Sequence, residues 1–288
     1  MHITQAKSIL TAYHNGINVY RGCTHGCVYC DTRSRCYGFT HPLKDVEVKS
    51  NAPELLEKAL RSRRKRCMIG TGSMCDPYQH CEKQLGLTRA CLEVICRNGF
   101  GAAVLTKSDL VLRDLDLLEE IHRRAKCVVQ TSLTVMDEGL SRVLEPHVCT
   151  SRRRVEVLEE LRRRGIPTVV WLAPVLPALT DTDENLDAIL DACVRTGVKG
   201  IVCFGMGMTL REGDREYYYQ ALDRHFPGLK EHYQKTYGNR YSLESPRQAE
   251  LMARFYRLCE DHGILHDNDA CFRYLQELPE EEGQLTLF

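Results

Sequence analysis

The sequence lacks an excess of charge of one sign, a long apolar run and an export signal. Lys and Arg together number 39, as do Asp and Glu, so the net charge points to no nucleic-acid or membrane partner, and such a partner would have to meet a local patch. No stretch approaches the roughly 18–20 consecutive apolar residues that a membrane span needs. The opening Met1–Lys7 leads into no sustained apolar segment, which favours a cytoplasmic protein without membrane contact.

Cysteine, in contrast, is abundant, with 15 residues. Because nothing points to export, these cysteines do not predict a disulfide framework. In a reducing compartment they indicate metal ligation or thiol chemistry for some, and burial as small apolar side chains for most.

Short β-branched runs alternate with helical patterns, which is typical of βα units around a parallel sheet. The expected strands are Ile17–Tyr20, Cys67–Gly70, Ala102–Thr106, Cys127–Ser132, Thr168–Leu172 and Gly200–Phe204. The expected helices are Pro53–Arg63, Glu82–Arg97, Arg113–Arg124, Arg152–Arg164 and Thr182–Arg195, the last capped by the Thr and Asp residues at 180–183.

Six such units predict an α/β fold, a partial (β/α)6 barrel of the TIM type that is open on one side. Its chemistry should lie on loops at the carboxyl ends of the strands. We expect this barrel over residues 1–210, a Tyr-rich helical C-terminal extension over 211–278, and a flexible tail over 279–288.

The sharpest motif is a cysteine triplet, Cys23, Cys27 and Cys30, directly after the first expected strand. Zinc sites usually combine two Cys/His pairs, and no second pair follows here at zinc spacing. A [4Fe–4S] cluster normally takes four thiolates, so three would leave one iron open to a small-molecule ligand. Gly22 and Gly26 allow the loop to wrap tightly.

This C-x3-C-x2-C spacing, with Tyr29 before the last cysteine, resembles the radical S-adenosylmethionine superfamily. The resemblance implies a [4Fe–4S] cluster on Cys23, Cys27 and Cys30, whose open iron binds S-adenosylmethionine. It further implies reductive cleavage of that cofactor to a 5′-deoxyadenosyl radical, with electrons from a reductant such as flavodoxin or ferredoxin.

Further runs carry a second resemblance, spread over nearly all of residues 10 to 265. They are Gly70–Gln79, Glu82-Lys83, Leu87-Thr88-Arg89, Leu105–Ser108, Gln130–Leu133, Tyr237-Gly238-Asn239 and Ser245-Pro246. They are similar to the spore photoproduct lyase-like family, a group often described as DNA repair photolyase-like. Most members of that group are not the lyase itself.

The resemblance implies five cofactor-binding residues, namely Tyr29, Ser73, Asp76, Lys107 and Ser132. Lys107 and Ser132 would hold the carboxylate and ribose side of S-adenosylmethionine, with Ser73 nearby. A lysine is a suitable anchor for a carboxylate in a half-dry site. From the residues alone, Lys107 could equally extend along the surface, and Ser132 could be a core hydroxyl with a satisfied hydrogen bond.

Cys75 is the expected catalytic residue. In the lyase a cysteine after the second strand returns a hydrogen atom to the substrate radical. Pairing the aspartates puts that cysteine at Ser73, so Cys75 is either a displaced hydrogen donor or an unrelated thiol. A second departure is Asp31, where the lyase has a tyrosine. An auxiliary cluster could draw on Cys36, Cys67, Cys81, Cys91 and Cys96, but a core role is favoured because Cys91 and Cys96 lie on an expected helix.

The last five residues, Gln284–Phe288, resemble the peptide by which bacterial DNA polymerases and repair proteins dock on the replication sliding clamp. The alternative is a tail that packs back on its own barrel. The basic run at 61–66 could contact phosphates. Those at 152–154 and 162–164 are interpreted as solvated helix faces balanced by Glu156, Glu159 and Glu160.

Together these features predict a radical S-adenosylmethionine enzyme, a lyase that acts on DNA in repair of a crosslinked pyrimidine. One alternative in the same class modifies tRNA or a peptide. An alternative from another class is a non-catalytic iron–sulfur or zinc protein that binds DNA or the clamp. The sequence identifies neither the substrate nor the electron donor.

Overall fold

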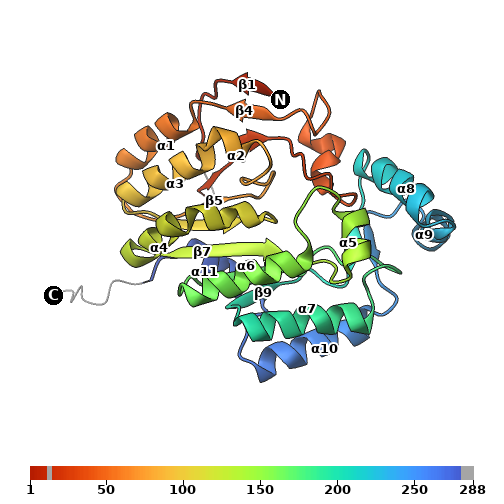
Figure 1. Cartoon of the computed structure of the whole chain (residues 1–288). Coiled ribbons are helices and arrows are strands. Elements are labelled where there is room, and N and C mark those ends of the chain that lie inside the picture. Colours follow the sequence, from red (N-terminus) through yellow and green to blue (C-terminus); the bar gives the residue numbers. More distant parts are fainter. Residues whose placement is uncertain (12–14, 280–288) are drawn as a thin grey trace.

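A computed structural model describes residues 1–11 and 15–279 of the chain, and its centre is a six-stranded parallel sheet (Figure 1). The strand order is β2 (Gly16–Ile17), β5 (Met68–Thr71), β6 (Gly101–Leu105), β7 (Cys127–Ser132), β8 (Thr168–Trp171) and β9 (Gly200–Val202). The sheet follows the order of the sequence and every neighbouring pair is parallel. The predicted partial barrel is therefore confirmed.

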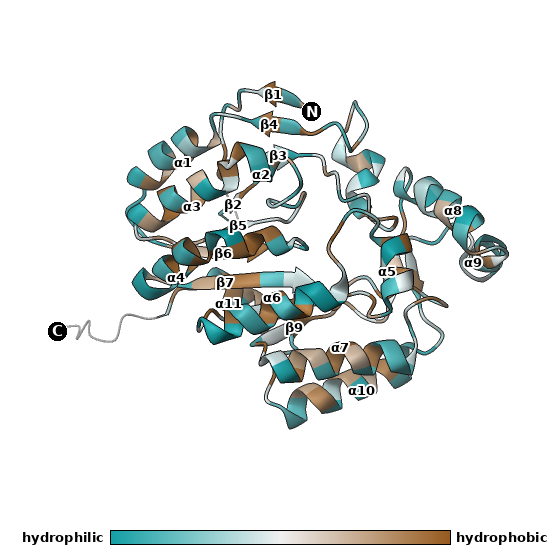
Figure 2. Ribbon diagram, viewed as in Figure 1, coloured by the Kyte–Doolittle hydropathy of each residue, from teal (hydrophilic) through white to brown (hydrophobic). Residues whose placement is uncertain are grey.

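Amphipathic helices cover the outside of the sheet. They are α1 (Ala52–Arg61), α3 (Leu87–Arg97), α4 (Leu115–Arg124), α6 (Ser151–Arg163) and α7 (Asp183–Thr196). The predicted cap of α7 is present, since the Thr182 side chain accepts a hydrogen bond from the Asn185 N–H. Figure 2 shows hydrophobic colours on the amino-terminal half of β7, hydrophilic to neutral colours on its carboxyl half, and hydrophilic colours along outward helix faces.

Two local predictions were wrong, and one helix was missed. The expected helix 82–97 is two helices, because Gly86 adopts a left-handed φ of 62° between α2 (Glu82–Leu85) and α3. The expected first strand is divided, and only its beginning pairs in the central sheet as β2. Its end, β3 (Tyr20–Arg21), pairs instead with β4 (Glu47–Lys49), which also pairs with β1 (His2–Thr4). The helix α5 (Glu138–Leu144) was not predicted.

The helices after residue 210 pack at three separate places. The pair α8 (Asp214–His225) and α9 (Leu229–Tyr237) shares a hydrophobic cluster with Cys27, Val28 and Tyr29. The helix α10 (Gln248–Asp261) packs on α7, and β11 (Ser242–Glu244) pairs with β10 (Gly207–Thr209). The helix α11 (Asn268–Gln276) packs Cys271 and Leu275 against side chains of the central sheet. These include Met68 and Val128, which lie near the amino ends of their strands.

These contacts tie the C-terminal helices to the barrel at its mouth, on its outer face and at its base. None of the helices in the described part of the chain is long and apolar enough to cross a membrane.

Candidate active site

A cavity of about 610 Å3 opens at the carboxyl ends of the strands. Its wall includes the cysteine loop, the last residue of β7, and residues that follow β5, β6, β8 and β9. All nine residues predicted for the site line it: Cys23, Cys27, Tyr29, Cys30, Ser73, Cys75, Asp76, Lys107 and Ser132. The structure therefore brings together side chains that the sequence separates by more than a hundred positions.

The cysteine loop is fixed by backbone contacts rather than by regular structure. Gly22 has a φ of 99°, and a Cβ there would lie 2.6 Å from the Leu43 carbonyl oxygen, so only glycine fits. The Cys23 N–H donates to that same oxygen at 2.8 Å. From the other side, Gln79 donates to the Gly22 carbonyl at 3.0 Å and accepts from the Thr24 N–H at 3.1 Å. The loop is thus held in place without its thiols.

The three thiols do not converge on one point. Among the described residues, the only His, Cys, Asp or Glu groups that bring three ligand atoms within 4.8 Å of one another are His2, His41 and Glu47. A tetrahedral zinc with Zn–S bonds of about 2.3 Å needs sulfurs about 3.8 Å apart. The three thiols do not meet this condition together, which argues against one zinc ion held by all three.

The environment of the thiols also favours a cationic ligand. Burial, reinforced by Asp76, raises the pKa of the Cys23 thiol to about 11, and burial raises the pKa of Cys27 further. A thiolate at these positions therefore needs nearby positive charge, which bound iron would supply. The donor set fits a [4Fe–4S] cluster.

Behind the cysteine loop lies a network of buried charges centred on Glu145. Its side chain and that of Arg154 are almost fully excluded from solvent and form an ion pair, and the Tyr29 hydroxyl donates to the same carboxylate. Arg154 also donates to the Ser132 carbonyl at 2.7 Å. Lys107 Nζ lies 4.0 Å from Glu145 and 5.4 Å from the centre of the Tyr29 ring.

This network fixes the charge of Lys107 in the cavity wall. Burial works against its ammonium group, but Cys27 and Glu145 outweigh burial and hold the pKa of Lys107 above its ordinary value. The side chain is 21% exposed, and it lines the cavity beside the cysteines. Lys107 is therefore a stable cation facing the space where a small anionic group can bind.

Asp76 uses its oxygens within the protein. It accepts hydrogen bonds from the Thr106 hydroxyl at 2.7 Å, the Lys107 N–H at 2.7 Å and the Tyr78 N–H at 2.8 Å. These bonds join the loop after β5 to the end of β6. Asp76 thus positions the backbone that carries Lys107.

The remaining predicted residues differ in exposure. Ser73 is exposed at the cavity, and Ser132 is buried at the end of β7. The Cys75 thiol is buried, donates to the Tyr20 carbonyl at 2.7 Å, and has its pKa raised by burial. Cys75 also packs in the hydrophobic core, so its side chain touches both the core and the cavity.

Sequence reasoning missed Glu145 and Arg154. Arg154 belongs to the run 152–154 that was interpreted as a solvated helix face. That interpretation was wrong for Arg154, which is 1% exposed, whereas Arg152 is 78% exposed. Consecutive arginines on a helix point in different directions. Their positions in the sequence do not show which of them meets a buried carboxylate. Glu145 directly follows the helix α5, which was not predicted.

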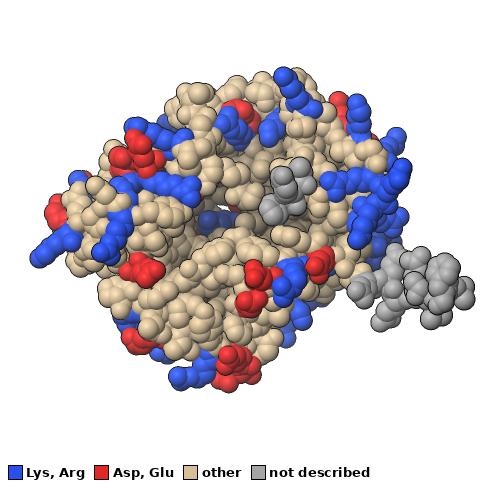
Figure 3. Space-filling model, turned by 180° about the vertical axis from the view of Figure 1, so that it is seen from behind, with Lys and Arg blue, Asp and Glu red and all other residues tan. Residues whose placement is uncertain are grey.

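The basic run at 61–66 lies between the end of α1 and the start of β5, at the end of the sheet opposite the cavity. The run is therefore remote from the candidate active site. Figure 3 shows Lys and Arg side chains around the rim of one face of the molecule, with Asp and Glu side chains among them. The predicted clamp peptide, Gln284–Phe288, lies outside the described residues.

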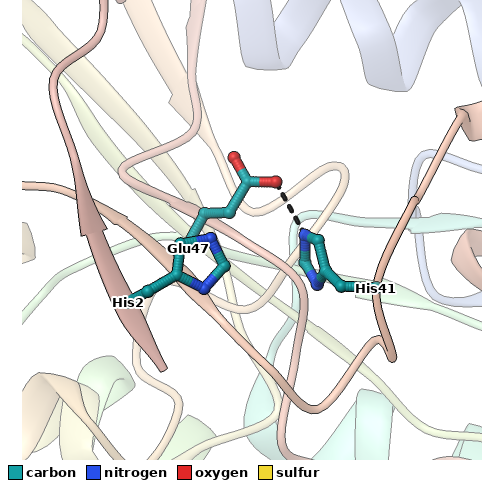
Figure 4. A group of neighbouring side chains, drawn as sticks. All are labelled: His2, His41 and Glu47. Carbon is teal, nitrogen blue, oxygen red and sulfur yellow. Dashed lines mark hydrogen bonds and ion pairs between the residues drawn. The ribbon is translucent and has the colours of Figure 1, made fainter.

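The side chains of His2, His41 and Glu47 meet at the three-stranded sheet formed by β1, β4 and β3 (Figure 4). His41 Nε2 lies 2.8 Å from Glu47, which Arg21 also contacts at 2.9 Å, and His2 pairs with Asp45 at 3.2 Å. Because Arg21 already neutralises Glu47, the contacts of His2 and His41 hold β1, and the loop that precedes β4, against β4.

The sequence matches one family model and several known proteins. The family model described as the radical SAM superfamily matches residues 17–193. An uncharacterized protein of Mycobacterium bovis is 34% identical over 261 residues, which cover 85% of this chain and 75% of that protein. A protein of Pseudomonas phage M6 named radical SAM Nalpha-GlyT isomerase is 25% identical over 179 residues, covering 62% of this chain and 35% of that protein.

Among solved structures, a cysteine-to-serine mutant of spore photoproduct lyase superposes with a TM-score of 0.67 at 14% identity. The match covers 92% of this chain and 80% of the lyase chain. Spore photoproduct lyase complexed with dinucleoside spore photoproduct gives a TM-score of 0.63 at 13% identity, with the same coverage of both chains. At this identity the likeness concerns the fold.

Proposed function

Because this chain belongs to the radical SAM superfamily, we propose that Cys23, Cys27 and Cys30 hold its [4Fe–4S] cluster and that it acts on DNA. When bound, the cluster and S-adenosylmethionine supply a reductive cleavage that yields a 5′-deoxyadenosyl radical. The observation that carries the proposal is the assembly of all nine predicted residues around one cavity at the carboxyl ends of the strands.

The roles of the side chains follow from their surroundings. Lys107, kept cationic by Glu145 and Cys27, binds the carboxylate of the cofactor's methionine. Ser73 and Ser132 offer hydroxyls to its ribose side. Tyr29 packs beside Lys107, and Asp76 positions the Lys107 backbone.

Two observations support DNA as the substrate. The fold is like that of spore photoproduct lyase over 92% of the chain. In addition, the cavity is lined by Trp171, Phe204 and Tyr241, of which Phe204 is 63% and Tyr241 50% exposed. Exposed aromatic rings at a cavity stack with bases that have been flipped out of a duplex, and each stacked base contributes about 1–3 kcal/mol.

We propose a lyase reaction on a crosslinked pyrimidine. A second candidate is an isomerisation, favoured by the name of the phage relative. Anaerobically reconstituted protein, reduced and given S-adenosylmethionine, should convert one of a panel of damaged oligonucleotides to a new product. Product formation on tRNA or a peptide, with none on any oligonucleotide, would reject DNA as the substrate.

We expect Cys75 to act on the substrate and not on the cofactor. Its thiol lies between the core and the cavity, where it can donate a hydrogen atom to a product radical, which Ala cannot do. Cys75→Ala should therefore still form 5′-deoxyadenosine but give unquenched adducts or stalled turnover. Ser73→Ala should instead weaken cofactor use. Mass spectrometry of the products checks both.

A matched control for this thiol is Cys91→Ala, because Cys91 is buried in the same hydrophobic core but does not line the cavity. Its products should be those of the wild type. A normal product at the normal rate from Cys75→Ala would show that Cys75 is a core residue only.

The tail provides a separate prediction. We propose that Gln284–Phe288 docks on the replication sliding clamp, since it combines a polar anchor with spaced leucines and an aromatic residue. Removing these five residues should abolish clamp binding, measured by surface plasmon resonance, and leave 5′-deoxyadenosine formation unchanged. Equal clamp binding by both proteins rejects the idea, and a large loss of thermal stability supports the packed-tail alternative.

A further inference from the structure

A second cavity, of about 390 Å3, lies between the cysteine loop, α5 and α8. Gly26 and Val28 line it, whereas Cys27 between them lines the active-site cavity. Consecutive residues of the loop thus face two different cavities, and the loop is a thin wall between them. The wall is closely packed, because a Cβ on Gly26, whose φ is 72°, would lie 3.1 Å from the His147 ring.

The lining of this second cavity is cationic. Its positive charge comes from Arg142 and Arg224, which lie beside the imidazoles of His147 and His225; we name these four residues the cationic face, and no carboxylate lines this cavity. Arg142 is 69% exposed and, among the residues that the structure describes, pairs only with Glu138 on its own helix, at 3.3 Å. Arg224 makes no ion pair with any residue of 1–11 or 15–279. In a chain of zero net charge, such a patch selects acidic partners.

A third cavity continues this surface on the other side of His147. It is also about 390 Å3, and its lining includes His25, His80 and Lys83. Its one carboxylate, Asp109, pairs with Arg153 at 2.9 Å. Lys83 therefore extends the positive charge on the outer side of the cysteine loop.

Electrons must reach the cysteine loop from outside the chain. The active-site side of the loop is occupied by cofactor and substrate during turnover. The outer side is the remaining approach, and at Gly26 it presents backbone without a side chain.

We propose that the cationic face is the docking site of an acidic one-electron carrier protein of the flavodoxin type. The proposal rests on the proposed function in one respect, namely that the cysteine loop holds the cluster. One electron leaves the carrier, which is oxidised, and enters the cluster, which is reduced. No bond is formed or broken and no proton moves.

The test compares two double variants with the same change in charge. Arg142→Glu/Arg224→Glu reverses the cationic face, and Arg64→Glu/Lys65→Glu reverses exposed residues at the other end of the barrel. Bacterial flavodoxin is the probe. Its dissociation constant is measured by calorimetry with both cluster-loaded and cluster-free protein, and the rate of cluster reduction is measured by anaerobic stopped flow.

We expect the face variant to bind flavodoxin at least about tenfold more weakly and to be reduced correspondingly more slowly, because charge steering raises association rates by about 10- to 1000-fold. Reduction by dithionite, a small ion that can enter through the open active-site cavity, should be unchanged. The variant at residues 64 and 65 should behave as the wild type, and added salt should abolish the difference.

Equal flavodoxin binding by all three proteins would overturn the proposal, as would an equal loss in both double variants. A loss of duplex oligonucleotide binding in the face variant, with flavodoxin binding unchanged, would overturn it in favour of a phosphate-binding surface. A wild-type protein that binds flavodoxin but no iron supports the docking surface while rejecting the proposed function, so the two failures are distinguishable.

Discussion

Replacing any one of Cys23, Cys27 or Cys30 with Ala is expected to abolish 5′-deoxyadenosine formation. A three-thiolate [4Fe–4S] site has no spare ligand, so the loss of one thiolate leaves a second iron without a protein ligand. Wild-type protein reconstituted without oxygen should bind about four irons, and each variant should bind far fewer. Iron analysis and chromatography of the nucleoside product measure both effects.

The matched control is Cys36→Ala. Cys36 is exposed, follows the triplet by six residues and does not line the cavity. It should retain full iron content and activity. A triplet variant that still forms 5′-deoxyadenosine at the wild-type rate would remove the assignment of these ligands.

The buried ion pair of Arg154 and Glu145 should dominate the stability of the site. Arg154→Met leaves the Glu145 carboxylate buried with only Tyr29 and Lys107 beside it, and breaking a buried pair by removing one partner costs about 3–5 kcal/mol. Denaturant unfolding should show a loss of this size. The exposed neighbour on the same helix gives the control, since Arg152→Met should change the free energy of unfolding by less than about 0.5 kcal/mol.

A second variant keeps this prediction testable if Arg154→Met does not fold. Glu145→Leu/Arg154→Met removes both charges and should recover part of the lost stability, because apolar side chains of similar volume often replace a buried pair well. A loss of less than about 1 kcal/mol in Arg154→Met would contradict the account of the network.

The same ion pair, Glu145–Arg154, makes the free energy of unfolding depend on pH. Burial acts to raise the pKa of Glu145, but Arg154 and Lys107 outweigh it and hold that pKa below its ordinary value. The stabilisation from ionised Glu145 is therefore fully present above the pKa of an unfolded Glu, about 4.3. It is lost as the pH falls through the lower pKa that Glu145 has in the folded protein. Between about pH 7 and pH 3, wild-type protein should lose more stability than Glu145→Gln.

Much of the barrel could be predicted because alternating βα patterns report burial locally. The expected strand 127–132 matches β7 residue for residue, and the ends of β5, β6 and β7 carried the predicted site residues. In a parallel sheet these ends meet at one edge, so the cavity followed from chain order alone.

What could not be predicted depends on contacts between distant residues. The division of the first strand arises because Tyr20 pairs with Val48, while Ile17 pairs with Thr71. The burial of Arg154 arises from Glu145 and from the Ser132 carbonyl, which no pattern around residue 154 reveals. The cationic face likewise combines α5 with α8, which are far apart in the sequence.

The central claim is that this chain cleaves S-adenosylmethionine by one-electron reduction at the cysteine loop. The direct measurement is the yield of 5′-deoxyadenosine from anaerobically reconstituted, dithionite-reduced protein without any substrate. We predict that 5′-deoxyadenosine and methionine form in equal amounts, and only when the reductant is present. Protein that carries about four irons and is fully reduced, yet forms no 5′-deoxyadenosine, would contradict the account.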